Sequence, residues 1–591
     1  MSPATAAGQR SERSWRSGIS AGVILSGWLL LMARLIQLQG TQRHELAERV
    51  QRQSVFREQI SARPGDILDR NGTVLATTQE VDSLYAVPAE IDDPLTWAWH
   101  VAGVLNLNAD ELYGRLVEYR ERQFLWVQRR IQDEQSEQLR KLPLKKGSWG
   151  LRREYLRQNL QSPAAAHVLG LRDIDNQGRG GLEEGLEKYL RGTPGERVMM
   201  RDARGMILEV DTDLSKPPVA GRSVVCSIDL PLQQDTERHL DVLMEKWRPR
   251  GACAIVMDPA TGEVLAMASR PAFDPLNLKN VPEEAWKNLA VSAVFEPGST
   301  FKPVIVAAAL QQGLLQRDEM IDCSYGLYRM GPRLLHDHHP YGMLSTADVL
   351  VKSSNIGMAK IGERLGLHGL YQAAVSFGFG SRTGIELPGE LPGLLQPLDR
   401  WNVYSLGSVP MGQELACTPL QLITAHAVLA NGGRLIRPTL ICRSIDETSG
   451  VVDGDIVLPG SSVQTPLLNA EHAEWLVREP LRDVVLRGTG KAARIQGLSI
   501  FGKTGTAQKL DPVTGTYSDR AWVVSFVCGA PAERPEALVL VMVDEPTAPG
   551  THYGGTVAAP VAAGILQAAM QRLAVLRGEE ITAVPGANGH R

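Results

Sequence analysis

One apolar segment near the N-terminus constrains the fold of this chain more than any other feature. Residues 17–33 carry no charge, and their length is at the short end of the roughly 17–25 residues with which a helix crosses a membrane. Arg34 extends this span if its charged end reaches the interface. Arg10, Arg13 and Arg16 precede the segment, and positive flanks stay in the cytoplasm. We therefore expect one membrane anchor, with everything after it exported.

The topology that follows is a cytoplasmic tail at residues 1–16, a transmembrane anchor at residues 17–38 and one large exported part. A cleaved signal peptide is the competing interpretation, but no A-x-A cleavage site follows the apolar run. No other segment approaches about 18 consecutive apolar residues, so we predict a single-pass protein.

The composition excludes two classes of function. Hydrophobic residues make up 43% and charged residues 22%, as in ordinary globular domains. The net charge of −4 leaves no basic excess for binding nucleic acid. The six cysteines contain no C-x-x-C pair, so neither a zinc cluster nor a disulfide framework is indicated. We expect the cysteines to be small buried apolar side chains, with one disulfide left open.

The first exported part, residues 39–220, is polar, and nothing in it has catalytic spacing. Residues 63–76 are typical of a strand, an Asn-Gly turn and a second strand. In residues 181–190, leucines recur at helical spacing. We interpret this part as a non-catalytic pedestal, joined to the next domain by the proline-rich residues 216–221.

Residues 221–576 have the pattern of an α+β domain. Two β-hairpins are predicted, one at residues 252–268 and one at residues 521–543, with a long and mostly helical insertion between them. An apolar helix closes the domain, and residues 577–591 are expected to be a flexible tail. Strands at both ends with helices between imply one antiparallel sheet covered by helices, with a mostly helical subdomain.

Three short motifs follow one another in this domain: S-x-x-K, S-x-N and K-T-G-T. They are Ser299 to Lys302, Ser353 to Asn355, and Lys503 to Thr506. Each alone is weak, because Ser299 or Asn355 can cap a helix and Lys503 can be a solvated strand residue. Their order, their gaps of roughly 50 and 150 residues and their local structure together indicate a serine nucleophile site.

The first motif places a nucleophile beside a base. Residues 296–299 predict a turn and residues 300–310 a helix, so Ser299 lies at a helix start and Lys302 is its neighbour on the helix. A serine needs a base to take its proton, and Lys302 is a base only when neutral. Burial, the helix N-terminus and a nearby Lys503 cation would each lower its pKa. We expect Ser299 to be the nucleophile and Lys302 the base.

The second motif lies in a predicted loop between two helices, where catalytic groups are commonly held. Ser353 can relay a proton towards a leaving amine. Asn355 can hydrogen-bond Lys302 and the amide of a substrate. Both are therefore candidate catalytic residues.

The third motif opens a predicted strand. Strand alternation places Thr504 and Thr506 on one face, where they suit gripping a carboxylate. Gly505 has no side chain, so an extended peptide can approach and add as a strand. Alternation alone sends Lys503 to the other face, so its long stem must curl into the site for it to be catalytic.

At these motifs the sequence resembles the class B penicillin-binding proteins, over residues 17 to about 575. The segments that look like the septal, cell-division branch are residues 295–303, 352–357, 69–72, 167–170 and 181–183. The resemblance implies the penicillin-binding transpeptidase fold for residues 221–576. It also implies a pedestal of the dimerisation type for residues 39–220.

The activity that the resemblance implies is that of a monofunctional peptidoglycan D,D-transpeptidase in septal wall synthesis. The penultimate D-Ala of a stem peptide would acylate Ser299 and release the terminal D-Ala, and the amine of a neighbouring strand would then attack the acyl-enzyme. β-Lactams would acylate the same serine.

The expected partners are a membrane glycosyltransferase of the shape-and-division family and other divisome proteins, with no cofactor and no nucleic acid. The expected location is the bacterial cytoplasmic membrane, with a cytoplasmic N-terminus and a periplasmic catalytic domain.

Two departures from the family pattern leave alternatives open. Pro64 precedes Gly65, where the family usually has Arg-Gly, and Gly412-Gln413-Glu414 stands where Gram-negative septal enzymes tend to have Gly-Tyr-Gly. The second departure leaves an elongation-type transpeptidase as an open alternative. A β-lactamase or D,D-carboxypeptidase is a further hypothesis, although no E-x-x-L-N motif separates S-x-N from K-T-G. A non-enzymatic β-lactam sensor or division scaffold is the third.

The cluster His336-Asp337-His338-His339 has the residue types of a zinc site. It lies just upstream of the S-x-N helix, in a variable surface loop of the family. We expect a solvated loop there and no metal.

Overall fold

The computed structural model describes residues 6–43, 55–201, 207–331, 333–445, 465–511 and 514–578. Contacts group the chain into two compact units. One contains Met1–Ala62 and Thr193–Val219, and the other contains Arg63–Gly192 and Ala220–Arg591. This grouping cuts across the predicted boundary at residue 220, which stays a prediction.

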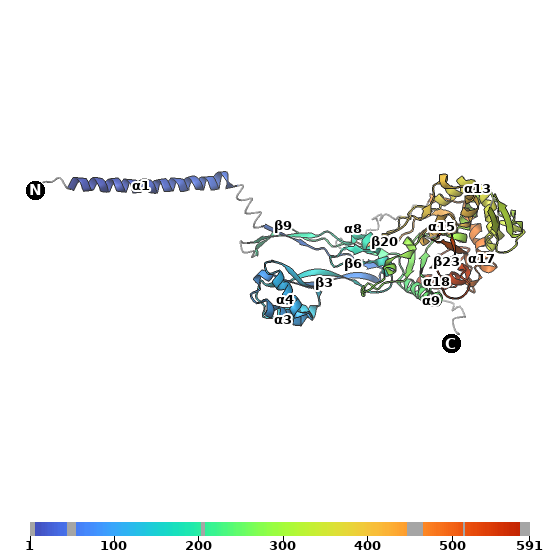
Figure 1. Cartoon of the computed structure of the whole chain (residues 1–591), viewed down its shortest axis with the longest axis horizontal. Helices are drawn as coiled ribbons and strands as arrows, with labels where there is room; N and C mark the ends of the chain where they lie inside the picture. Colours follow the sequence, from blue (N-terminus) through green and yellow to red (C-terminus); the bar gives the residue numbers. More distant parts are fainter. Residues whose placement is uncertain are drawn as a thin grey trace. The chain divides into compact units, whose positions relative to one another are not determined.

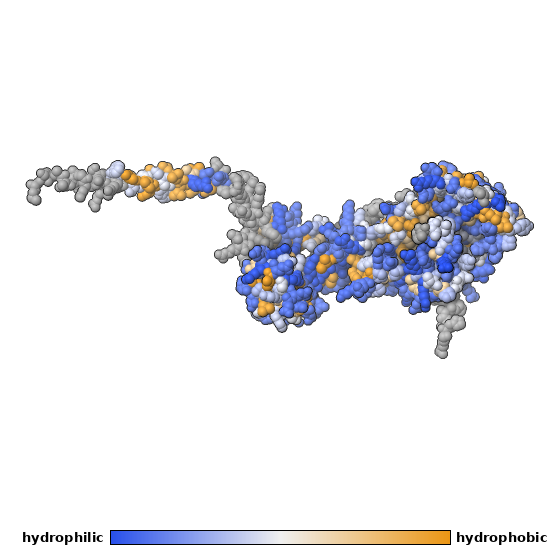
Figure 2. Space-filling model, in the orientation of Figure 1, coloured by the Kyte–Doolittle hydropathy of each residue, from blue (hydrophilic) through white to orange (hydrophobic). Residues whose placement is uncertain are grey.

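The first unit contains the apolar N-terminal helix. Helix α1 (Ala6–Ile36) continues into a π-helical turn, and its apolar side chains are visible along it in Figure 2. Within it, Gly18–Gly40 has a mean hydropathy of 1.9, and none of this stretch is buried in the protein. Such a helix is long and apolar enough to cross a membrane. The same unit has a three-stranded antiparallel sheet of β1 (Val55–Ile60), β8 (Gly195–Arg201) and β9 (Ile207–Lys216).

A second helix, α18 (Gly554–Leu576), is the apolar helix predicted to close the domain, and by length and mean hydropathy it is also apolar enough to cross a membrane. Burial explains its composition. A third of it (33%) is buried, and it packs against strands of the central sheet and against helix α9 (Leu230–Trp247). A helix that covers a sheet is apolar for the same physical reason as one that lies in lipid.

The second unit begins with the pedestal strands. The predicted strand–turn–strand at residues 63–76 is confirmed, because β2 (Ile67–Leu68) pairs antiparallel with β3 (Val74–Ala86). Strand β3 also pairs with β4 (Leu125–Ile131) and along its length with β5 (Trp149–Asn159). Helices α3 (Pro94–Leu105) and α4 (Ala109–Glu118) pack beside these strands around a small core of their own (Figure 1).

The pedestal strands continue into the catalytic part through a shared sheet. Strand β10 (Ser223–Cys226) pairs with β2 on one side and with β20 (Ile441–Ile445) on the other. This pairing explains why residues on both sides of the predicted boundary at residue 220 fall in one compact unit.

The centre of the second unit is a five-stranded antiparallel sheet, which confirms the predicted α+β fold. Its strands, in spatial order, are β12 (Val264–Arg270), β11 (Gly251–Met257), β24 (Ala537–Asp544), β23 (Tyr517–Ala530) and β22 (Phe501–Leu510). Both predicted hairpins lie in this sheet. Strand β22 is at an edge.

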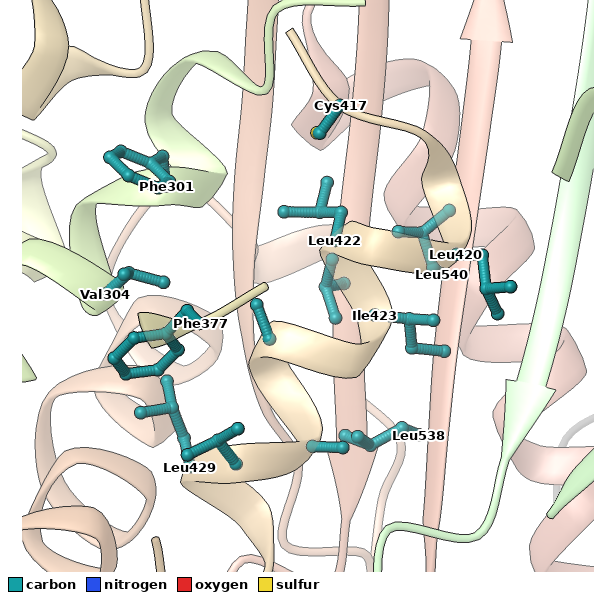
Figure 3. Close-up of a cluster of buried hydrophobic side chains, with 14 of the residues drawn as sticks. Phe301, Val304, Phe377, Cys417, Leu420, Leu422, Ile423, Leu429, Leu538 and Leu540 are labelled. Carbon is teal, nitrogen blue, oxygen red and sulfur yellow. The ribbon is translucent and has the colours of Figure 1, made fainter. Parts of the chain in front are cut away.

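Each face of this sheet packs on a different hydrophobic core, because side chains alternate along a strand. On β24, Val539 and Val541 face helices α9 and α18. Leu538 and Leu540 face the other core, where they lie near Leu422 and Ile423 of helix α15 (Pro419–Ala430) (Figure 3). The two layers of helices hold the sheet rigid and leave the edge β22 for the site.

Five of the six cysteines are buried, as predicted, and the prediction was wrong for Cys442. All six are free, and only Cys442 is exposed.

Candidate active site

One cavity of about 940 Å³ brings the three predicted motifs together. Its lining includes Ser299 of the first motif, Ser353 and Asn355 of the second, and Thr504 and Thr506 of the third. The motifs are far apart in the chain, and the edge strand β22 supplies one wall.

Ser299 lies in a 3-10 turn (Gly298–Phe301) that leads into helix α11 (Lys302–Gln311), close to the predicted helix start. Gly298 has a φ of 55°, and its N–H donates to the carbonyl of Gly412 at 3.0 Å. A Cβ atom at Gly412 would lie 2.1 Å from the carbonyl oxygen of Gly298. The glycine at 412 therefore lets the chain pack directly behind the turn that contains Ser299.

Lys302 is completely buried, and its Nζ donates three hydrogen bonds. It donates to the carbonyl of Ser353 at 2.7 Å, to the Ser353 hydroxyl at 3.1 Å and to Oδ1 of Asn355 at 2.8 Å. The predicted bond between Lys302 and Asn355 is thus present. Burial lowers the pKa of Lys302 to about 7, against the opposing charge of Asp337. A lysine in this state can accept a proton near neutral pH.

Lys503 also contacts Ser353, the residue to which Lys302 donates. It lies on β22, where alternation alone would point it away, but its Nζ donates to the Ser353 hydroxyl at 3.1 Å and to the carbonyl of Thr504 at 3.3 Å. Burial and the charge of Lys302 lower the pKa of Lys503. Its long stem therefore does curl into the site.

The S-x-N motif lies between helices α12 (Thr346–Lys352) and α13 (Asn355–Ser376), as predicted. Ser353 has a φ of 56°, so the chain turns sharply there. Ser354 caps α13 by accepting the N–H of Gly357 at 2.9 Å. The turn and the cap hold Ser353 and Asn355 against Lys302.

Asp337 is a part of the site that the sequence analysis missed. It follows β15 (Arg333–His336) and accepts the N–H of Asn355 and, at 3.1 Å, the N–H of Ile356. It also accepts the hydroxyl of Ser354 at 2.5 Å. Asp337 therefore caps α13 from another segment and fixes the S-x-N loop.

The two threonines of the third motif face the cavity together. The Thr504 hydroxyl is hydrogen-bonded to the Thr489 hydroxyl at 2.7 Å, and the Thr506 hydroxyl accepts the N–H of Gly554 at 3.1 Å. Their neighbours Thr489 and Gly554 also line the cavity and were not predicted. Hydroxyls so arranged present donors to an anion.

Gly505 faces the opposite way. A Cβ atom there would lie 2.4 Å from the Ser525 hydroxyl oxygen and 2.9 Å from the carbonyl oxygen of Pro297. The reason predicted for this glycine, access for a peptide, was therefore wrong. Its absent side chain lets the Ser299 turn pack against β22, and its contact with substrate stays a prediction.

Glu296, three residues before Ser299, is a second group that the sequence analysis missed. It accepts the hydroxyl of Tyr517 at 3.0 Å and the N–H of Glu414 at 3.0 Å. Burial raises the pKa of its carboxyl. Glu296 thus connects the turn that contains Ser299 to strand β23 and to the segment after Gly412.

The histidine cluster is exposed, as expected, and its three imidazoles also line the cavity. The ring of His338 lies 5.8 Å from the ring of Tyr553, edge to face. In the described part of the chain, no group of three or more His, Cys, Asp or Glu side chains is arranged to hold a metal ion.

Two family models match the chain. Residues 252–567 match the penicillin binding protein transpeptidase domain, and residues 59–226 match the penicillin-binding protein dimerisation domain.

Individual proteins match over most of their lengths. The peptidoglycan D,D-transpeptidase FtsI of Escherichia coli K12 is 32% identical over 561 residues, which are 94% of this chain and 91% of the relative. Stage V sporulation protein D of Bacillus subtilis is 34% identical over 516 residues, 86% of this chain and 78% of the relative. The crystal structure of penicillin binding protein 3 from Mycobacterium tuberculosis with aztreonam has a TM-score of 0.65 at 28% identity, covering 88% of this chain and 98% of that one.

Proposed function

The chain belongs to the class B penicillin-binding proteins and is a peptidoglycan D,D-transpeptidase, and from this premise we propose that it works through an acyl-enzyme on Ser299 in septal wall synthesis. The observation that carries the proposal is the meeting of Lys302, Lys503 and Asn355 around Ser353, in the cavity that Ser299 lines.

The first half of the proposed reaction forms an ester. Neutral Lys302 takes the proton of the Ser299 hydroxyl as its oxygen attacks the carbonyl carbon of the penultimate D-Ala. The amide bond to the terminal D-Ala then breaks, and its nitrogen receives a proton through the Ser353 hydroxyl, which lies 3.1 Å from Nζ of Lys302. The terminal D-Ala leaves as a free amine.

The second half transfers the acyl group. The amine of a neighbouring peptide strand attacks the ester carbonyl, gives up its proton along the same path and frees Ser299. The product is a cross-link between two peptides, and every group of the enzyme returns to its first state.

The remaining motif residues bind the donor peptide. Thr504 and Thr506 hold its terminal carboxylate, Gly505 contacts its backbone and Asn355 holds its amide. Lys503 stabilises the carboxylate and keeps the proton on Ser353 mobile. Hydrogen bonds from these hydroxyls to an ionised carboxylate are stronger than bonds between two neutral groups.

The location and partners of the protein extend the proposal. Gly18–Gly40 anchors the chain with its N-terminus in the cytoplasm, since Arg10, Arg13 and Arg16 precede it. The catalytic domain then faces the wall, beside a membrane glycosyltransferase of the shape-and-division family and other divisome proteins.

The test of the chemistry is covalent labelling. Membranes that contain the full chain are incubated with fluorescent penicillin and run on a denaturing gel. Ser299→Ala should carry no label, while Ser376→Ala, a control on α13 whose hydroxyl donates to its own helix at 2.6 Å, should label as the wild type does. Covalent label on Ser299→Ala would overturn the assignment of the nucleophile.

The test of the cellular role is depletion of the protein in growing cells. Filaments would support a septal role. Round cells would instead support the elongation-type alternative, which the sequence Gly412-Gln413-Glu414 leaves open.

A further inference from the structure

His426 is a buried titratable side chain that packs against the turn that contains Ser299, and it takes no part in the proposed proton transfers. It lies in helix α15 and is 2% exposed. Its Nε2 lies 2.9 Å from the carbonyl oxygen of Thr300, the residue after Ser299. A carbonyl oxygen only accepts hydrogen bonds, so the imidazole must carry a hydrogen on Nε2 and donate it.

The carbonyl of Thr300 needs a donor from outside its own turn. It lies where the 3-10 turn Gly298–Phe301 gives way to helix α11 at Lys302. In a 3-10 turn the donor to this oxygen would be the N–H of the residue three places on, but Pro303 has no N–H. Thr300 is completely buried, and buried backbone groups are almost always paired. His426 supplies the bond that Pro303 cannot make.

Ser299 therefore lies between two peptide groups that are held by other segments. On one side, the N–H of Gly298 donates to the carbonyl of Gly412 at 3.0 Å. On the other side, the carbonyl of Thr300 accepts the bond from His426. The backbone from which the Ser299 hydroxyl projects is thus fixed by two residues that lie far along the chain.

The imidazole of His426 is neutral at the pH where Lys302 can act as a base. Burial lowers the pKa of His426 to about 4, the charge of Lys503 adds to this effect, and the bond to Thr300 opposes it. A neutral donor holds the carbonyl without adding a positive charge to a domain that already buries Lys302 and Lys503 completely. The residue type suits a positioning role and not the role of a second base.

We propose that His426 is a positioning residue of the transpeptidase, whose Nε2–H holds the carbonyl of Thr300 and so keeps the hydroxyl of Ser299 in place for Lys302. A displacement of about 1 Å in a reacting group can slow a reaction by about a hundredfold. His426 is not part of the cavity lining, so loss of its bond should slow acylation without weakening the binding of a β-lactam. The inference rests on the proposed function, because it takes Ser299 as the nucleophile.

The experiment replaces His426 by side chains of similar length that differ in the donor. His426→Gln keeps an N–H, whereas His426→Met has none and adapts well to a core. His426→Leu is a second variant without a donor, and it decides the test if His426→Met does not fold. Stopped-flow measurements on the full chain in detergent, at several concentrations of benzylpenicillin, separate the acylation rate constant from the dissociation constant of the complex that precedes acylation.

The matched control is His167→Met in the pedestal. His167 is also a buried histidine, and its Nε2 lies 2.7 Å from a backbone carbonyl oxygen, that of Ala285. Its replacement removes the same kind of bond from a place outside the cavity lining. Thermal unfolding of all variants shows how much stability each has lost.

We expect the acylation rate constant to fall by about tenfold or more in His426→Met, with the dissociation constant changed by less than about twofold. His426→Gln should stay within about threefold of the wild type, since it keeps the donor. His167→Met should lose stability and still acylate at the wild-type rate. Acylation of His426→Met at the wild-type rate, or of His426→Gln as slowly as of His426→Met, would overturn this inference alone.

The same protein samples separate this inference from the proposed function. Wild-type enzyme treated with benzylpenicillin is digested, and mass spectrometry locates the acyl group. An acyl group on Ser299 is the expected result. An acyl group on another residue would overturn the proposed function, and this inference with it.

Discussion

Lys302 and Lys503 share one hydrogen-bond acceptor, because the Nζ atom of each lies 3.1 Å from the hydroxyl oxygen of Ser353. Both lysines are completely buried, so water solvates neither charge, and each charge also repels the other. The arrangement favours loss of a proton from one of them, and a neutral lysine at this point is the base that the proposed attack by Ser299 requires.

The first prediction concerns pH. Acylation by benzylpenicillin should rise by about tenfold per pH unit below pH 7 and level off above it, because Lys302 accepts a proton only after losing its own and its pKa is about 7. Asp337 raises that pKa, so Asp337→Asn should move the inflection to lower pH. Stopped-flow acylation rates across pH 5 to 9 measure both. A flat profile in the wild type would contradict a base with this pKa.

The second prediction concerns Gly505. In Gly505→Ala the new methyl group would meet Ser525 and Pro297, so we expect a loss of about 1–3 kcal/mol in unfolding free energy and a severe loss of acylation. Gly103→Ala, in an exposed part of helix α3 (Pro94–Leu105) with nothing within 4 Å of the added atom, should be neutral or stabilising. Thermal unfolding and penicillin labelling compare the two, and equal behaviour would argue against close packing behind the nucleophile turn.

The third prediction separates positioning from stability at Asp337. Asp337→Ala removes the side chain that caps α13 from another segment. Ser345→Ala removes the cap of α12, in which the Ser345 hydroxyl accepts the N–H of Asp348 at 3.0 Å. Each should cost about 1 kcal/mol of unfolding free energy. Only Asp337→Ala should slow acylation, by about tenfold or more, because only Asp337 holds the backbone of Asn355. Similar acylation rates for both variants would show that Asp337 acts on stability alone.

The fourth prediction concerns the pedestal. The buried carboxylate of Glu183 accepts Nε of Arg157 at 2.6 Å and Nε of Arg172 at 2.6 Å. Glu183→Ala leaves two buried guanidinium groups without this partner, so we expect a loss of about 3–5 kcal/mol. The exposed neighbour Glu184 serves as control, and Glu184→Ala should cost at most about 1 kcal/mol. Urea unfolding, monitored by limited proteolysis of the pedestal, measures the loss of unfolding free energy. Similar losses in both variants would refute a structural role for the buried ion pairs.

Local patterns predicted much of the catalytic fold. The predicted hairpin at residues 252–268 is formed by β11 and β12, and the predicted helix that closes the domain is α18. Such elements are encoded by nearby residues, through side-chain periodicity and turn chemistry. The apolar helix α18 shows the limit of this reasoning, because hydropathy alone does not separate a core helix from a membrane helix.

The candidate site was predictable in its residue types and less so in its contacts. Asp337 lies in a histidine-rich loop whose pattern suggested metal or solvent, and nothing local signals that its carboxylate caps α13. The packing of Gly505 against Ser525 and Pro297 could not be predicted either. Strand alternation states which residues share a face, but not which residues that face contacts.

The amino-acid sequence was enough to predict the order of the motifs, the helix start at Ser299, the face shared by Thr504 and Thr506, and an apolar segment long enough to be a membrane anchor. Those properties depend on residues close together in the chain. The tertiary structure was needed to show that Lys503 curls towards Ser353, that Asp337 caps α13 from another segment, and that the pKa of Lys302 falls to about 7. Each of these depends on burial and on distances between segments far apart in the sequence, and both arise only when the helices close over the sheet.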